Sequence, residues 1–410
     1  MSIESVAPRS MSSWTQRLQD VMPFGSSTSS KAPSLEPEEP AVIVRGKGCR
    51  VWDDRGREFI DFRNGLGPVT LGYGFPATDE AIRKQLDSGL VYGHPHPLEC
   101  EVAEMLRDVI PCAEQVRFLK TGGEALAACI KIARAYTNRE HVIQVGYNGW
   151  INSLSAGARI LPGQSAASNV APPGVPTCLS ALHHTCAWND LAAMEQLFQQ
   201  HDKEIAAVVV AADYKQMSAG STYYPAIRAL TQKHGAVLIY DEIVTGFRIS
   251  RAGAQEYFKV TPDMAVYAKG MANGMPLSAY VGKRDLMQTA KRAVISTTYG
   301  GEALSLAAAR ATLQTYDCEN VVAYLWSAAE KLWSRVNQLM KDRNIGAKLE
   351  GFWPCAIWSF GHLDSSKFFR ACYKHGLSLY NVSYVNFSHR DADIDDAVKR
   401  FEKVCDELSA

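Results

Sequence analysis

An aspartate and a lysine at the ends of two consecutive strand-like runs have the residue types and spacing for Schiff-base chemistry. Asp241 ends the apolar run "AVLIY" (236–240), and Lys269 follows the next such run, "MAVYA" (264–268). Ligands of open α/β sheets bind at the carboxyl ends of the strands, so both side chains can face one crevice. Pyridoxal phosphate (PLP) chemistry needs such a pair, because a lysine binds the cofactor aldehyde and an aspartate keeps the pyridine nitrogen protonated.

The surroundings of Lys269 favour a reactive amine. The residues that follow it, "GMANGMPL", are mostly small or apolar. Burial among such residues disfavours the ammonium form, so we expect a lowered pKa for this lysine. Two ordinary alternatives stay open at this point: Asp241 could cap a strand end, and Lys269 could extend along the surface into solvent.

A glycine turn between a strand and a helix is typical of phosphate binding. The segment "FLKTGGEALAACIKIARAY" runs from a strand through Thr121, Gly122 and Gly123 into a helix that begins near Glu124. Glycine lets backbone N–H groups approach a phosphate, and a helix N-terminus favours an anion. Such a turn is also common in ordinary loops. After the next strand, Tyr147 offers an aromatic plate for a cofactor ring, or a core side chain.

Composition excludes several classes of partner. Lys plus Arg number 43, as do Asp plus Glu, so the net charge is zero and gives no reason to expect nucleic acid or an anionic membrane as partner. The longest apolar runs are too short to span a bilayer, and the first residues, "MSIESVAPRSMSSW", contain no apolar core of a secretory signal. Ten scattered cysteines without a CxxC pair indicate a reduced, cytoplasmic protein.

The sequence predicts no metal site. The histidine clusters visible along the chain are His183-His184 near Cys186 and His94-Pro95-His96. Neither has the ligand spacing of a zinc site.

The order of the expected elements indicates an α/β protein with a second, smaller domain. Residues 41–62 alternate like a hairpin, and from about 76 to 300 helices alternate with β-branched strands, which favours a largely parallel sheet covered on both faces. Two long amphipathic helices follow, over roughly 302–315 and 320–342. We expect residues 1–75 to join the small domain, 76–305 to form the large α/β domain, and 306–410 to form a small α+β domain.

Taken together, these segments resemble the class III aminotransferases, and most closely the branch that contains glutamate-1-semialdehyde aminomutase. The resemblance covers nearly the whole chain. It includes "DEIVTGFR", "AKGMANGMPLSA", the hairpin "VRGKGCRVWDDRGREFIDF", the loop "NGLGPVTLGYG" and the segment "TTYGGEALSLAAA". It implies the PLP-dependent transferase fold type I: a mostly parallel, seven-stranded type of sheet between helices, plus a smaller α+β domain.

The resemblance also implies a role for each site residue. Lys269 is expected to bind PLP and to shuttle protons, Asp241 to pair with the pyridine nitrogen, and Ile243 to pack on the ring face opposite Tyr147. The phosphate is expected to bind Thr121, Gly122, Gly123 and, from the other subunit, Thr298. The protein is therefore expected to be a homodimer. Three departures from the family pattern are Asn148 for histidine, Ala211-Ala212 for Glu-Pro, and Gly123 for threonine.

The substrate is inferred from the N-terminal segment. Where the aminomutases carry an arginine for a substrate carboxylate, this chain has "SSTSSKAP" with Lys31, and lysine lacks the bidentate fork of arginine. This serine-rich segment resembles the 6′-position aminotransferases of aminoglycoside antibiotic biosynthesis. We expect a sugar aldehyde as acceptor, glutamate or glutamine as donor, and Glu302 and Tyr384 near the pocket mouth. The alternatives are an aminomutase or amino-acid transaminase, and a PLP-dependent epimerase.

Overall fold

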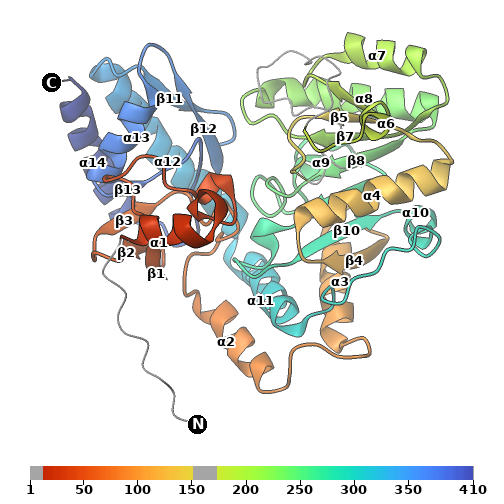
Figure 1. The fold of residues 1–410 in the computed structure, drawn as a ribbon, viewed down its shortest axis with the longest axis horizontal. Helices are drawn as coiled ribbons and strands as arrows, with labels where there is room; N and C mark the ends of the chain where they lie inside the picture. Colours follow the sequence, from red (N-terminus) through yellow and green to blue (C-terminus); the bar gives the residue numbers. More distant parts are fainter. Residues whose placement is uncertain (1–12, 151–172, 410) are drawn as a thin grey trace.

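The computed structural model describes residues 13–150 and 173–409 (Figure 1). In the view of Figure 1 the N- and C-terminal segments lie together on one side, and the strands of the large sheet lie on the other. The helix α11 (Ala303–Glu319) lies between these two groups. The first and last parts of the chain thus build one unit around the central α/β unit.

The central unit is a seven-stranded sheet in the order β4-β10-β9-β8-β7-β5-β6. Only β10 is antiparallel to its neighbours; the pairs β5–β6, β5–β7, β7–β8 and β8–β9 are parallel. The strands are β4 (Gln115–Leu119), β5 (His141–Val145), β6 (His183–Cys186), β7 (Ile205–Ala211), β8 (Val237–Asp241), β9 (Met264–Tyr267) and β10 (Ser278–Gly282). The expected fold class, a mostly parallel sheet between helices, is confirmed.

Helices cover both faces of this sheet, which is why β7 and β8 consist entirely of buried residues. On one face α4 (Gly122–Thr137) packs against alternate strand residues such as Val209 and Ile239. The other face packs against α3 (Pro97–Val109), α7 (Leu191–Gln200), α8 (Gly220–His234) and α11.

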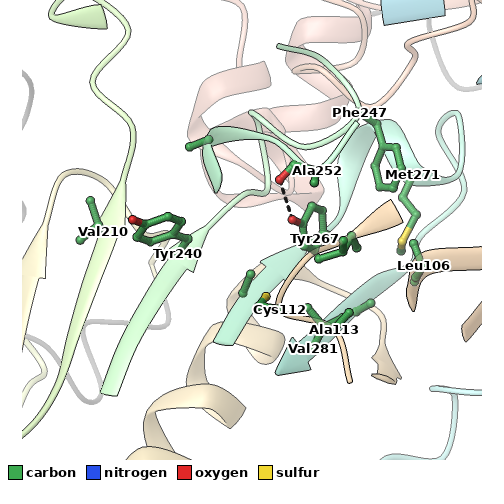
Figure 2. Close-up of a cluster of buried hydrophobic side chains, with 14 of the residues drawn as sticks. Leu106, Cys112, Ala113, Val210, Tyr240, Phe247, Ala252, Tyr267, Met271 and Val281 are labelled. Carbon is green, nitrogen blue, oxygen red and sulfur yellow. Dashed lines mark hydrogen bonds between the residues drawn. The ribbon is translucent and has the colours of Figure 1, made fainter. Parts of the chain in front are cut away.

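A buried cluster beneath the carboxyl edge of the sheet contains residues from the segments that follow β8 and β9. Tyr267, at the end of β9, donates its hydroxyl hydrogen bond to the carbonyl oxygen of Ala252 at 2.7 Å (Figure 2). Phe247 and Met271 belong to the same cluster and are fully buried (Figure 2). The residues that follow β8 and β9 are therefore anchored to one core.

The second unit combines both ends of the chain. The expected hairpin is confirmed as β1 (Ile43–Lys47), β2 (Arg50–Asp53) and β3 (Glu58–Asp61), and β3 pairs in parallel with β13 (Leu377–Ser378). A three-stranded sheet follows the order β11-β12-β14. The other elements of this unit are β11 (Ala347–Glu350), β12 (Cys355–Phe360), β14 (Val382–Tyr384), α12 (Val321–Asp342), α13 (Ser365–Lys374) and α14 (Asp391–Ser409).

The helix α11 packs in the same core as the large sheet, whereas most of the buried residues of α12 pack with the small unit. We therefore propose to divide the two domains near Asn320, after α11 and not at residue 305. The remaining elements are α1 (Trp14–Val21), η1 (Pro23–Gly25), η2 (Ser29–Lys31), α2 (Pro76–Leu86), α6 (Thr177–Ser180), η3 (Met217–Ala219), α9 (Ala254–Tyr257), η4 (Lys269–Met271) and α10 (Arg284–Gln288).

No helix among the described residues combines the length and apolar character needed to cross a bilayer.

Candidate functional site

The structure brings Asp241 and Lys269 together at the carboxyl edge of the sheet. Asp241 is the last residue of β8, Lys269 lies just past the end of the parallel neighbour β9, and the two strands are paired in register. Lys269 has a φ of 41°, in the left-handed region that non-glycine residues rarely adopt, so its backbone is held there by the surrounding structure. Each charge shifts the pKa of the other toward ionisation. Both groups therefore lie at one edge of the sheet, close enough to interact electrostatically.

Lys269 is partly buried, and its amine has the lowered pKa expected from the sequence. Burial, aided by the positive charge of Arg248, lowers the pKa from 10.5 to about 8, and the negative charge of Asp241 acts in the opposite direction. An amine with such a pKa is available as a nucleophile nearer to neutral pH than an ordinary lysine.

Asp241 is buried at the end of β8. One carboxylate oxygen accepts a hydrogen bond from the Ile243 amide at 3.0 Å, and the other accepts one from the Asn148 side-chain amide at 3.3 Å. Burial raises the pKa of Asp241, and these two hydrogen bonds and Lys269 act against that rise. The side-chain oxygen of Asn148 is buried and has no hydrogen-bond partner among the described residues, so a donor is missing at this point.

The glycine turn begins α4 and touches the residue expected against the ring face. Thr121 caps the helix: its hydroxyl accepts from the Glu124 amide at 3.3 Å, and the Glu124 carboxylate accepts from the Thr121 amide at 2.8 Å. A Cβ atom on Gly122 would lie 2.4 Å from Cδ1 of Ile243, so this position requires glycine. The first-turn amides have no partner within the helix and carry its positive dipole end.

These features fit a cofactor with an anionic group at one end and a ring at the other. The Gly122–Gly123 turn offers amides to the anion, Ile243 offers an apolar contact, and Asp241 offers a carboxylate to a ring nitrogen. Tyr147 is 48% exposed.

Arg248 is a buried cation of the site for which the sequence predicted no role. Its guanidinium donates to the carbonyl oxygens of Val244 (2.9 Å) and Gly67, and it lies 4.6 Å from the ring centroid of Tyr384. Its Nη1 atom is buried without a hydrogen-bond partner among the described residues. Its position in the motif "DEIVTGFR", seven residues after Asp241, is the sequence feature that could have identified it as a site residue.

The three candidates for substrate contact differ in their placement. Tyr384 is buried against Arg248 and near Gly67. Lys31 is exposed at the end of η2, where the Ser30 carbonyl accepts from Arg63 at 2.6 Å.

Glu302 forms an ion pair with Lys120 at 2.9 Å and caps α11 through the amides of Leu304 and Ser305. These contacts explain its position without a substrate.

Thr298, expected to reach the other subunit, is exposed beside Tyr299, which is 59% exposed. Nearby apolar side chains are also exposed, including Val294 at 77% and Leu90 at 41%. The amide of Ala303 donates to the carbonyl of Leu90 at 2.8 Å, which links the segment after Thr298 to the loop after α2.

Comparison with known proteins agrees with this geometry. Residues 33–404 match the family model described as "Aminotransferase class-III". The chain is 31% identical to the glutamate-1-semialdehyde 2,1-aminomutase of Desulforamulus reducens, with 94% of each chain covered. It is 35% identical to the protein of that name from Syntrophobacter fumaroxidans, over 76% of this chain and 72% of the other.

Two solved structures show the same fold. An omega-transaminase from Sphaerobacter thermophilus superimposes with a TM-score of 0.86 at 22% identity, covering 97% of each chain. A glutamate-1-semialdehyde aminomutase from Pseudomonas aeruginosa gives a TM-score of 0.80 at 18% identity, covering 96% of this chain and 93% of the other.

Proposed function

The chain belongs to the class III aminotransferase family, and from that membership we propose that it binds PLP between Lys269 and Asp241 and moves an amino group onto an aldehyde or ketone carbon. The observation that carries the proposal is the partly buried Lys269, with its pKa lowered to about 8, beside the buried carboxylate of Asp241. Bound PLP supplies an aldehyde that captures amines and a ring that accepts negative charge from the adjacent carbon.

Separate residues of the chain would have separate roles in this reaction. The amine of Lys269 would hold the cofactor aldehyde and would carry a proton to or from the substrate carbon. The carboxylate of Asp241 holds a proton on the ring nitrogen. The amides of Gly122 and Gly123, with Thr121, bind the phosphate at the start of α4.

Other residues would position the ring. Ile243 lies against Gly122 and would cover one face of the ring, and Tyr147 would cover the other. Arg248 keeps a positive charge near Lys269 and so favours the neutral, nucleophilic form of the amine.

We also propose a homodimer in which Thr298 binds the phosphate of the other subunit. The exposed apolar side chains of Leu90, Val294 and Tyr299 support this proposal, because apolar surface of this kind commonly marks an interface. Light scattering during gel filtration measures the mass directly. A dimer of the expected mass is required, and a Thr298→Ala variant is expected to remain dimeric but to bind PLP more weakly.

For the substrate, an aminomutase-type exchange on a small amino aldehyde is favoured by the relatives described above, which carry that name and span most of the chain. A sugar or aminoglycoside acceptor at its 6′ position is the second candidate. It rests on the serine-rich segment 26–31 with the exposed Lys31, which is held near Arg63 through Ser30. An epimerase would use the same lysine and aspartate.

Absorbance of the bound cofactor during single turnovers separates these candidates. Glutamate, glutamine, a diaminovalerate-type compound and an aminoglycoside with a 6′-amine would each be added to the purified holoenzyme. Conversion of the cofactor to its pyridoxamine form by any of them supports amino transfer. Conversion by the diaminovalerate-type compound alone supports the aminomutase, and conversion by the aminoglycoside supports the sugar acceptor. Failure of every amine to convert the cofactor would overturn the proposal.

A further inference from the structure

Three histidines from three separate elements meet at the amino edge of the large sheet, away from the site described above. His141 begins β5, His184 lies in the edge strand β6, and His201 follows the last residue of α7. One ring nitrogen from each of them lies within 4.8 Å of the others. The rings of His141 and His184 are nearly parallel (3°), and the ring of His201 is inclined to them by 28° and 30°. The ring centroids lie 5.1 Å (His141–His184), 4.5 Å (His141–His201) and 4.3 Å (His184–His201) apart.

Strand register and helix packing explain why the three rings meet. In the parallel pair β5–β6, His184 lies opposite Ile143, and Ile143 is two residues from His141, so all three side chains point to the same face of the sheet. The helix α7 packs on this face through the buried Met194 and Phe198, and its end delivers His201 to the same place.

A carboxylate lies beside two of these rings, outside the group of three ring nitrogens. Glu204 precedes β7, and its backbone carbonyl accepts from the His141 amide at 3.1 Å. Its side-chain oxygen lies 3.2 Å from Nδ1 of His201 and 3.7 Å from Nε2 of His141. Nδ1 of His141 lies 2.8 Å from Nε2 of His184.

The environment of the cluster disfavours protonation of the imidazole rings and leaves their nitrogens free to bind a metal cation. Burial and the neighbouring imidazoles lower the pKa of His184 to about 4, and burial also lowers the pKa of His141. His184 is therefore neutral at pH 7, and the shift for His141 also favours the neutral ring, which is the form that binds metals. The carbonyl end of the ten-residue helix α7 adds negative potential beside His201.

We propose that His141, His184 and His201 bind one zinc ion per chain, with a solvent molecule as fourth ligand, and that the carboxylate of Glu204 orients two of the imidazoles. Three imidazole nitrogens with one open position are a ligand set that tetrahedral Zn²⁺ accepts. Zn–N bonds of about 2.0–2.1 Å would place tetrahedral ligand nitrogens roughly 3.3 Å apart. The 2.8 Å contact between His141 and His184 would lengthen slightly to reach that spacing, and the more distant nitrogens would move closer.

The site has access to solvent. A surface hollow of about 360 Å³ is lined by His184 and His201 together with Thr177, Ser180 and Gln200. A bound ion would tie the edge strand β6 to β5 and to the end of α7. It would stabilise this edge of the sheet without contacting Lys269 or Asp241.

The test is zinc binding by the untagged, PLP-loaded protein after treatment with a chelator. Calorimetric titration with Zn²⁺ is expected to give one ion per chain. The variant His201→Gln, at a partly exposed position, is expected to bind at least roughly 10-fold more weakly, and Glu204→Gln to show a smaller loss. His375→Gln is the matched control, because His375 also pairs with a carboxylate, Glu407, at 2.8 Å, but far from the cluster in the second unit. Its affinity should equal that of the wild type.

Absorbance of Co²⁺ bound in place of Zn²⁺ gives an independent readout, since a four-coordinate site produces intense visible bands. These bands should appear with the wild type and with His375→Gln and disappear with His201→Gln, while the cofactor absorbance and circular dichroism stay unchanged. The proposal is overturned if the wild type binds no stoichiometric Zn²⁺, if its Co²⁺ spectrum shows only weak octahedral bands, or if folded His201→Gln binds zinc as tightly as the wild type.

Discussion

The two edges of the central sheet differ in electrical character. At the carboxyl edge, β4 leads into the N-terminus of α4, whose free amides attract an anion. At the amino edge, α7 ends beside the first residues of β5 and β6, and helix C-termini favour a cation. Parallel strands and their connecting helices impose this polarity, so one sheet provides a phosphate end and a cation end from the same topology.

Burial lowers the pKa of a nitrogen base in both regions, with different results. His184 has a pKa of about 4 and is neutral at pH 7, ready to act as a ligand. Lys269 has a pKa of about 8, so a fraction of the amine is neutral near physiological pH and the aspartate beside it retains the rest as ammonium. The same physical effect favours the role proposed for each base, a metal ligand at one edge and a nucleophile at the other.

The largest expected effect comes from removing the amine of the carboxyl-edge site. Lys269→Ala should slow amino transfer by at least about 10³-fold, because proton transfer at the substrate carbon loses its base. Single-turnover cofactor absorbance measures the rate, and Lys269→Arg, which keeps the positive charge, is the control and should be equally slow. Zinc binding should stay unchanged in both variants. A loss of zinc affinity would contradict the independence of the two edges.

A smaller but still large effect is expected from Asp241→Asn. The amide keeps the size of the side chain but removes the negative charge, so we expect a loss of roughly 10²-fold or more in rate with a weaker effect on cofactor affinity. Measuring the rate and the cofactor affinity separately distinguishes a role of Asp241 in catalysis from a role in holding the cofactor. A variant with the full rate would show that Asp241 does not serve the ring nitrogen.

Gly122→Ala tests the contact between the phosphate turn and the ring face. The new Cβ would lie 2.4 Å from Ile243, and such overpacking costs about 1–3 kcal/mol. Thermal unfolding of the holoenzyme and PLP titration should show lower stability and weaker binding. Ile243→Val in the same chain should recover part of the loss. If the double variant is no better than Gly122→Ala, the close contact is not the cause.

The smallest expected effect is on the stability of the apoprotein and its dependence on pH. The folded-state pKa of Lys269 is lowered from 10.5 to about 8, so the unfolded chain binds more protons between these values and stability rises with pH across this window. Below pH 8 the burial of the charged amine lowers the free energy of unfolding by its full amount, about 1–2 kcal/mol after allowing for partial exposure. Apo Lys269→Met should therefore be more stable than the wild type at pH 7, and the difference should vanish near pH 10.5. Denaturant unfolding at several pH values checks this; a constant difference would contradict it.

Local patterns were sufficient to predict much of the carboxyl-edge site. Asp241 and Lys269 lie directly after strands, and the Thr121–Gly122–Gly123 turn lies before a helix, so their relation depends on parallel strands ending at one edge. Arg248 was missed as a site residue although it stands in the quoted motif. Its importance comes from burial beside Lys269 and Tyr384, which no local pattern reveals.

The sequence by itself determined the α/β class, the hairpin and the lysine–aspartate pair, because hydrophobic periodicity and turn residues act over short stretches of chain. Only the tertiary structure decided that His141, His184, His201 and Glu204 meet, and that Glu302 is engaged by Lys120 and the start of α11. Strand register and helix docking bring together residues that are far apart in the chain, and the sequence carries no spacing signal for such contacts.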